Sequence, residues 1–331
     1  MFNLTLIPVV FVIIFALTFD FINGFSDTAN AIATSVSTKA LSPRKAIMVA
    51  AVLNFAGALT GTAVAFTIGK SIIDPQMVTP LILIAALVGA IFWNVFTWYF
   101  GIPSSSSHAL IGGLTGAVIA ALGSASVKWQ GFLMILAGLL SAPVIGVILG
   151  SLVMTLLFWL FKRAAPNRIN NNFRKLQIVS ACALSFSHGS NDAQKSMGII
   201  TMVLVGAHLL GEFNVPLWVK AACAFSMAMG TALGGWRIIK TMGGKIFRIE
   251  PINGFASDFT SCLVILAASH FGFPVSTTHV VSSSIMGVGA AKRFKGVRWN
   301  IARQILIAWV LTIPSSALVA ICIYNLLRFF V

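Results

Sequence analysis

The chain has 331 residues, of which 58% are hydrophobic and only 9% are charged. Soluble proteins average about 25% charged residues, and the mean hydropathy of this chain is +0.96. A soluble domain of this size could not cover its surface with so few charges, which excludes a cytosolic enzyme and a disordered chain. We therefore expect an all-α polytopic membrane protein, because a backbone in lipid must satisfy its own hydrogen bonds.

The charge is strongly basic, with 22 Lys and Arg against 7 Asp and Glu residues and a formal net charge of +15. The basic residues are confined to short clusters between apolar runs, which is typical of cytoplasmic loops. We therefore expect a lipid bilayer as partner and no nucleic acid. The N-terminal apolar stretch lacks a basic flank and a clear cleavage site, so we interpret it as the first membrane helix.

Runs free of Asp, Glu, Lys and Arg define the expected membrane helices, since about 20 residues cross the hydrocarbon. They are 1–19, 46–69, 75–127, 129–161, 176–191, 196–211, 221–236, 259–291 and 304–327. Four basic clusters separate groups of these runs. Their members are Lys39, Arg44 and Lys45; Lys162, Arg163, Arg168, Arg174 and Lys175; Arg237, Lys240, Lys245 and Arg248; and Lys292, Arg293, Lys295 and Arg298.

A single path through the membrane places all four clusters in the cytoplasm. The chain then crosses five times before the second cluster and five times after it, with both termini outside. Asp74 and Glu212 fall in outer loops. The segments 101–125 and 272–291 are rich in Gly and Ser, so they could instead be re-entrant hairpins.

Two motifs recur in the same order in the two halves of the chain. Asn23-Gly24-Phe25-Ser26-Asp27-Thr28-Ala29-Asn30 resembles His188-Gly189-Ser190-Asn191-Asp192-Ala193-Gln194-Lys195. Gly101-Ile102-Pro103-Ser104-Ser105-Ser106-Ser107-His108 matches Gly272-Phe273-Pro274-Val275-Ser276-Thr277-Thr278-His279. With an odd number of crossings per half, this predicts two inverted-topology repeats with broken helices, a transporter signature. We expect the repeats at 1–161 and 176–331, joined by a basic cytoplasmic linker at 162–175.

The second motif pair has the character of an anion site. Proline suits the first turn of a helix, and hydroxyls around that start leave N–H and O–H donors pointing one way. The positive end of the helix dipole at the same place also favours an anion. Two such starts meeting at the centre would hold a tetrahedral oxyanion from two sides. The alternative is that Ser and Thr merely cap or back-bond within a helix.

Four of the seven acids, Asp20, Asp27, Asp192 and Asp258, lie in or beside expected spans. An ionised carboxylate there costs at least about 2.5–3.5 kcal/mol by insertion scales. Asp27 and Asp192 follow Gly24 and Gly189, where we expect the helix to unwind and offer carbonyls to a small cation or a proton. Asp258 could instead lie at the membrane interface.

One basic residue, Lys195, falls deep within an expected span. It could be a structural ion-pair partner of Asp192, a substrate contact, or both. His108, His188 and His279 stand next to the motifs and could handle protons, or could be hydrogen-bonded core residues.

These motifs together resemble the inorganic phosphate transporter (Pit) family of membrane symporters. The resemblance runs through nearly the whole chain, and Gln194-Lys195 is similar to the bacterial low-affinity branch, associated with proton-coupled uptake of phosphate, partly as a neutral metal–phosphate complex. It implies an inverted-repeat fold, usually dimeric, in the cytoplasmic (inner) membrane. It also implies binding roles by position: phosphate at Ser105, Ser106, Ser107, Ser276, Thr277 and Thr278, and the coupling cation at Asp27, Asn30, Asn191 and Asp192. We add Lys195 as a phosphate contact.

Two departures from the family pattern favour protons over sodium. The common Asn before the first Asp is Ser26 here, and Lys195 replaces an Asn that is more usual in the sodium-coupled branch. We expect a proton-coupled phosphate symporter with no cofactor, no certain metal site and no enzymatic activity. The alternatives are a sodium-coupled phosphate carrier or a sulfate carrier of the same fold. A membrane serine hydrolase using Ser106 or Ser107 is disfavoured, because a duplicated motif offers a nucleophile twice where one is needed.

Overall fold

The computed structural model describes residues 6–234, 239 and 241–330, and within these ranges the chain is nearly all helical and contains no strand. Its α-helices are α1 (Ile7–Ser37), α2 (Pro43–Ala58), α3 (Ala63–Ser71), α4 (Pro80–Tyr99), α5 (Ser106–Leu122), α6 (Trp129–Phe161), α7 (Pro166–Gly206), α8 (Leu217–Leu233), α10 (Pro251–His270), α11 (Thr277–Arg293) and α12 (Trp299–Leu327). Three short 3₁₀-helices are η2 (Pro75–Met77), η3 (Ser124–Ser126) and η5 (Phe294–Gly296), and η4 (Thr241–Lys245) is a short π-helix.

The two halves share an order of elements. Helices α4 and α10 each have 20 residues, and α5 and α11 each have 17. Helices α6 and α12 each begin at a tryptophan and each contain an internal proline. The indole Nε1 of Trp129 donates to the Ser124 carbonyl at 3.0 Å, and that of Trp299 donates to the Phe294 carbonyl at 3.1 Å. The similarity of the motifs is therefore accompanied by equal helix lengths and by two equivalent tryptophan contacts.

The first helices of the two halves, α1 and α7, run antiparallel. Three side-chain hydrogen bonds between them show this: Asp20 with Ser196, Asn23 with Asp192, and Thr38 with Gln177. Residue numbers rise along α1 as they fall along α7. This is the relation expected between the leading helices of inverted repeats, and inversion of the whole halves stays a prediction.

Gly24 and Gly189 lie inside continuous helices, so the prediction that α1 and α7 unwind at these glycines was wrong. The glycines serve close packing instead: a Cβ on Gly24 would collide with the Met227 carbonyl oxygen of α8, and one on Gly189 with that of Asn54 in α2. Small residues allow such approach between membrane helices, while an unbroken helix keeps its backbone satisfied in lipid. The breaks fall before α5 and α11, and between α2 and α3, which bend by 68°.

Several helices are suited to a bilayer. In the described residues, α1, α4, α6, α10 and α12 are long and apolar enough to cross a membrane, and the bent pair α2–α3 would add a sixth span. Large apolar side chains project outward from α6 and α12, including Leu140, Val144, Val310 and Leu318. The protein is therefore a multi-pass membrane protein. The number of ten crossings stays a prediction.

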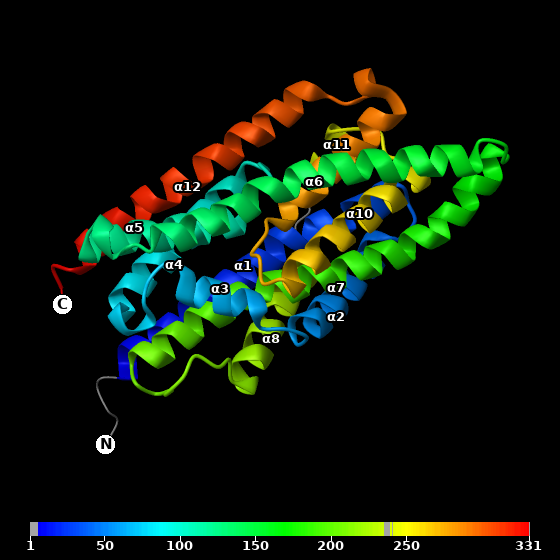
Figure 1. Ribbon diagram of the computed structural model, residues 1–331. Helices are drawn as coiled ribbons and strands as arrows, with labels where there is room; N and C mark the ends of the chain where they lie inside the picture. Colours follow the sequence, from blue (N-terminus) through cyan, green and yellow to red (C-terminus); the bar gives the residue numbers. More distant parts are fainter. Residues whose placement is uncertain (1–5, 235–238, 240, 331) are drawn as a thin grey trace.

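Basic residues gather at one end of the bundle. The Ser37 hydroxyl donates to the Gly243 carbonyl, and the backbone N–H of Arg298 donates to the Ile246 carbonyl at 2.9 Å. These contacts join the first, third and fourth basic clusters, and Lys39, Arg248 and Arg298 line one surface cavity. The α6–α7 turn, which holds the second cluster, lies at the same end, opposite the start of α1 and the end of α12 (Figure 1). Arg237 and Lys240 of the third cluster lie outside the described residues.

The expected linker at 162–175 is mostly helical, because α7 already begins at Pro166. Proline fits this first helical position since its missing N–H has no partner there. Residues 162–165 alone separate α6 from α7, and the division into two repeats at this point stays a prediction.

Candidate functional site

Two buried acids occupy equivalent places at the centre of the bundle. Asp27 lies on α1 and Asp192 on α7, and each accepts a hydrogen bond from a hydroxyl in the first turn of a short helix. Ser106 at the start of α5 donates to Asp27 Oδ2 at 2.5 Å, and Thr277 at the start of α11 donates to Asp192 Oδ2 at 3.3 Å. Ser106 and Thr277 occupy the same position in the repeated hairpin motif. The structure therefore brings the two motif pairs together in the same way in each half.

Asp192 has an ionic partner within the same helix. The Lys195 ammonium nitrogen lies 2.7 Å from Asp192 Oδ1, and His188 Nε2 lies 3.6 Å from Asp192 Oδ2. The amide of Asn23 on α1 also donates to Asp192 Oδ2, at 3.3 Å. Lys195 and Asp192 are both buried. The ion pair considered from the sequence is thus formed, and it places the lysine beside the acid rather than in open solvent.

The amides predicted to bind the coupling cation have different surroundings. Asn30 donates to Thr278 Oγ1 at 2.8 Å, which links α1 to the start of α11. Asn191 donates to Ser269 Oγ at 2.9 Å, and its own Oδ1 accepts from the Val275 N–H at 3.4 Å. Asn30 therefore contacts a predicted phosphate residue, whereas Asn191 holds the extended backbone that precedes α11.

Capping accounts for two of the predicted phosphate hydroxyls. Ser105 and Ser276 are the N-cap residues of α5 and α11, and their hydroxyls accept from the backbone N–H groups of His108 and His279 at 3.2 and 3.3 Å. Ser107 Oγ donates to the Val275 carbonyl at 2.8 Å and joins the two hairpins. The hydroxyls of Ser106 and Thr277 face the acids. They are therefore the donors best placed to release a carboxylate as hydrogen-bond acceptor and to bind an oxyanion in its place.

The helix starts add a favourable field at this point. The N-termini of α5 and α11 both begin next to the acid pair, and the positive end of a helix dipole favours negative charge. Two buried carboxylates already supply that charge. An incoming oxyanion would be repelled until the carboxylates are neutralised, which makes the site suited to coupled binding of an anion and a cation.

The sequence reasoning missed a polar network centred on Asn54. The Asn54 amide donates to Thr28 Oγ1 at 2.9 Å and to Thr231 Oγ1 at 3.0 Å, and its Oδ1 lies 3.1 Å from His188 Nδ1. This network supports the imidazole that faces Asp192. Asn54 is a buried amide inside an apolar run, and the rarity of such groups in membrane helices is the signal that could have singled it out.

Gln194, which the sequence offers only as a marker of the low-affinity branch, has a structural contact that was not predicted. Its side-chain Oε1 accepts from the Val64 N–H at 2.8 Å, and its Nε2 donates to the Ser190 carbonyl at 2.5 Å. The side chain thus satisfies a free donor at the start of α3, where the α2–α3 break leaves the backbone unpaired.

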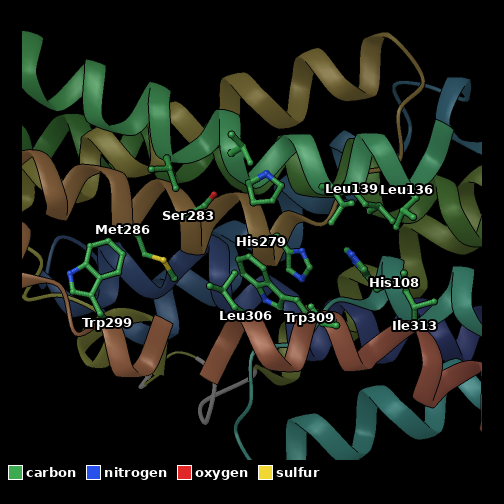
Figure 2. Close-up of a pocket in the computed structure, with 15 residues that line it drawn as sticks. His108, Leu136, Leu139, His279, Ser283, Met286, Trp299, Leu306, Trp309 and Ile313 are labelled. Atoms are coloured by element: carbon green, nitrogen blue, oxygen red, sulfur yellow. The ribbon is translucent and has the colours of Figure 1, made fainter. Parts of the chain in front are cut away.

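The two motif histidines lie apart from the acids. His108 and His279 have ring centroids 4.4 Å apart, and His279 stacks on Trp309 with centroids 3.7 Å apart. They border a groove between α6 and α12 that is otherwise lined mainly by apolar side chains such as Leu139 and Ile313 (Figure 2). An apolar groove does not suit a phosphate ion. Whether the histidines handle protons stays a prediction, and among the three it is His188 that contacts an acid.

Asp20 and Asp258 are also buried. Asp20 Oδ1 accepts from Ser196 Oγ, and Asp258 Oδ1 accepts from Thr34 Oγ1, both at 2.7 Å. Asp258 is therefore inside the bundle and not at its surface. In the described part of the chain, no three His, Cys, Asp or Glu side chains cluster in a way that could hold a metal ion.

Residues 23–320 match the model of the phosphate transporter family. The chain belongs to this family. It is 52% identical over 329 residues to a Bacillus subtilis protein named "Probable low-affinity inorganic phosphate transporter", with 98% of this chain and 99% of that protein covered. A protein of the same name from Rhizobium meliloti is 50% identical, with 93% of each covered.

A solved structure described as "The sodium-dependent phosphate transporter" has the same fold as this chain. The TM-score is 0.87 at 26% sequence identity, and the match covers 98% of this chain and all of the other. The resemblance drawn from the four motifs is confirmed by these matches. The relatives are transporters, which agrees with the expectation that the chain is not an enzyme.

Proposed function

We propose that this family member carries inorganic phosphate across the cytoplasmic membrane as a secondary active symporter driven by protons. The observation that carries the proposal is the paired contact of Ser106 with Asp27 and of Thr277 with Asp192. It supplies one donor and one acid from each half at the starts of two helices. The names of the relatives supply phosphate as the substrate.

Coupling follows from the charge at this site. Protons bind first to Asp27 and Asp192 and remove the repulsion between the carboxylates and an anion. Phosphate then takes the place of the carboxylates as acceptor for Ser106 and Thr277, with the helix starts of α5 and α11 facing it. One half moves against the other and opens the site on the opposite side.

Lys195 favours protons as the coupling ion. Its ammonium nitrogen occupies a place 2.7 Å from Asp192 Oδ1, where a sodium ion bound to the same oxygen would meet a like charge. A proton needs no such space, because it becomes part of the carboxyl group. The adjacent ammonium favours the ionised form of Asp192, so proton binding there requires Lys195 to turn from Asp192 towards phosphate, which combines the ion-pair and substrate-contact roles considered for it.

Sodium coupling is the second candidate, and specific atoms favour it. The side-chain carbonyl oxygens of Asn23 and Asn30 are buried and have no hydrogen-bond partner among the described residues. Oxygen ligands of this kind suit a small hard cation, and the structural relative is described as sodium-dependent. Sodium near Asn30 would leave the Asp192–Lys195 pair intact.

The orientation in the membrane is part of the proposal. The basic clusters share one end of the bundle, and basic loops are retained in the cytoplasm. Both termini would then lie outside. Assembly into a homodimer and transport of a neutral divalent metal–phosphate complex follow from the family resemblance and are proposed with it.

Uptake of labelled phosphate into proteoliposomes tests the function. We expect accumulation with an inward proton gradient, none with a sodium gradient alone, and little competition from excess sulfate. Accumulation driven by a sodium gradient alone would show that sodium, and not the proton, is the coupling ion. If sulfate competed as well as unlabelled phosphate does, the proposal that phosphate is the specific substrate would be wrong. Titration with Mg²⁺ at constant free phosphate measures whether the complex is the species carried.

A further inference from the structure

One face of α1 carries a continuous row of buried polar side chains. Its members are three or four residues apart, which keeps them on the same side of a helix. They are Asp20, Asn23, Asp27, Asn30 and Thr34, with Thr38 at the C-cap of α1. Each is hydrogen-bonded to another helix: to Ser196, Asp192, Ser106, Thr278, Asp258 and Gln177 in that order. At 1.5 Å per residue the row spans roughly 27 Å, close to the thickness of the hydrocarbon layer.

Asp258 meets this row away from the central acids. Its contact is Thr34, seven residues and thus about two helical turns, or roughly 10 Å, beyond Asp27 towards the basic end of the bundle. The row continues one turn further to Thr38, whose hydroxyl donates to Gln177 at 2.7 Å. Thr38 also lines the surface cavity that contains Lys39 and Arg248. Asp258 therefore stands between the central site and water at the basic face.

The surroundings of Asp258 leave its charge uncompensated. One carboxyl oxygen accepts from Thr34, and the other is buried with no hydrogen-bond partner. None of the ion pairs among the described residues includes Asp258. The Ser180 hydroxyl of α7 faces it, and the thiol of Cys262 on α10 is the titratable group nearby. A carboxylate buried in this way is costly, and binding a proton removes the cost.

We propose that Asp258 is a second proton-binding site, which takes coupling protons from the central acids and releases them at the basic face. In the transfer, the O–H bond of the Asp27 carboxyl group breaks as a water molecule accepts the proton. Because about 10 Å separates the two levels, further water carries a proton on, and a new O–H bond forms at the free oxygen of Asp258. Asp27 becomes a carboxylate and Asp258 becomes neutral. Water at the Thr38–Gln177 level then accepts the proton and hydrates the Asp258 carboxylate. The inference rests on the proposed proton coupling.

Two assays on the same proteoliposomes separate this role from substrate binding. Exchange of internal for external phosphate without a gradient needs no proton release, because the carrier returns loaded. Net uptake driven by an inward proton gradient requires release in every cycle. We expect Asp258→Asn to lower gradient-driven uptake by about tenfold or more and to retain exchange. Asp258→Glu should recover net uptake.

Ser261→Ala is the matched control. Ser261 lies one turn along α10 and its hydroxyl only back-bonds to the Ser257 carbonyl, so both activities should be retained. A pH-sensitive dye in the lumen gives a second readout, since acidification during phosphate uptake should be lost in Asp258→Asn. Persistent exchange shows that this variant is folded.

The outcomes are distinct. Proton-driven accumulation by Asp258→Asn at the wild-type level would overturn the inference and leave the proposed function standing. Equal loss of exchange and accumulation, unrecovered by Asp258→Glu, would also overturn it, because the residue would then serve folding or substrate binding. Absence of proton-driven uptake in the wild-type protein would overturn the proposed coupling, and this inference with it.

Discussion

The Lys195 ammonium nitrogen lies 2.7 Å from Asp192 Oδ1, and both side chains are buried in the middle of α7. In lipid, this pair removes the cost of two isolated charges that sit three residues apart on one helix. The Asp192 carboxylate is thus contacted by the Lys195 ammonium group, the Thr277 hydroxyl and the Asn23 amide. Together they balance its negative charge.

The pair makes a prediction for stability. Asp192→Asn or Lys195→Gln alone leaves one buried charge without its partner, which costs about 3–5 kcal/mol. The double variant removes both charges and should be more stable than either single variant. Thermal unfolding of the purified protein in detergent measures this.

The same three variants give a control for function. The double variant should recover stability without recovering proton-driven uptake, since Asp192 is proposed to bind the proton. Additive losses of stability in the double variant would show that the two side chains do not interact across the 2.7 Å contact.

Gly24 makes a second prediction, which concerns packing. A methyl group at this position meets the Met227 carbonyl oxygen of α8, a backbone atom that cannot rotate away. Gly24→Ala should therefore force α1 from α8 and destabilise the protein by about 1–3 kcal/mol. Gly211→Ala is the control, because nothing lies within 4 Å of a Cβ at that position. Unfolding temperatures compared between the two variants decide the point, and similar values would contradict close packing at Gly24.

Gly24 shows which features of the fold can be predicted from the sequence and which cannot. The low charge content predicts a membrane protein, and the repeated Gly-x-Pro motif predicts paired helix starts with hydroxyls, which the structure forms at α5 and α11. Whether a glycine opens a helix or admits a neighbour depends on what packs against it. For Gly24 that neighbour is Met227, more than 200 residues away in the chain, and no local pattern reveals it.

The candidate site divides in the same way. Repeat alignment matched Asp27 to Asp192 and Ser106 to Thr277, and the structure joins each acid to the hydroxyl of its own half. It could not show that Ser105 and Ser276 act as caps, because a cap and an anion ligand share the same residue type and position. The contact of Asn54 with His188 was equally hidden, since it joins residues of different helices.

Asn54 makes a third prediction. Asn54→Ala removes the amide that bonds Thr28 and Thr231 and leaves the His188 Nδ1 without its 3.1 Å partner. A buried polar group left unsatisfied costs about 1–3 kcal/mol, so the unfolding temperature should fall. Asn300→Ala, at an exposed position at the start of α12, should leave it unchanged. Equal unfolding temperatures for the two variants would show that the Asn54 network does not support the fold.

The last prediction compares the two halves directly. Ser106 and Thr277 are proposed to turn from Asp27 and Asp192 to phosphate, so Ser106→Ala and Thr277→Val should each weaken phosphate binding. A hydrogen bond to a charged group contributes about 1.5–3 kcal/mol, which corresponds to a rise in KM of about tenfold or more. Initial uptake rates against phosphate concentration measure it. Ser106→Thr keeps the hydroxyl and should keep most of the affinity, while Ser126→Ala, on an exposed turn, controls for general loss of activity. If one variant raises KM and its counterpart does not, phosphate is held by one half alone. The proposal of a two-sided phosphate site would then be wrong, although each acid contacts a hydroxyl in the structure.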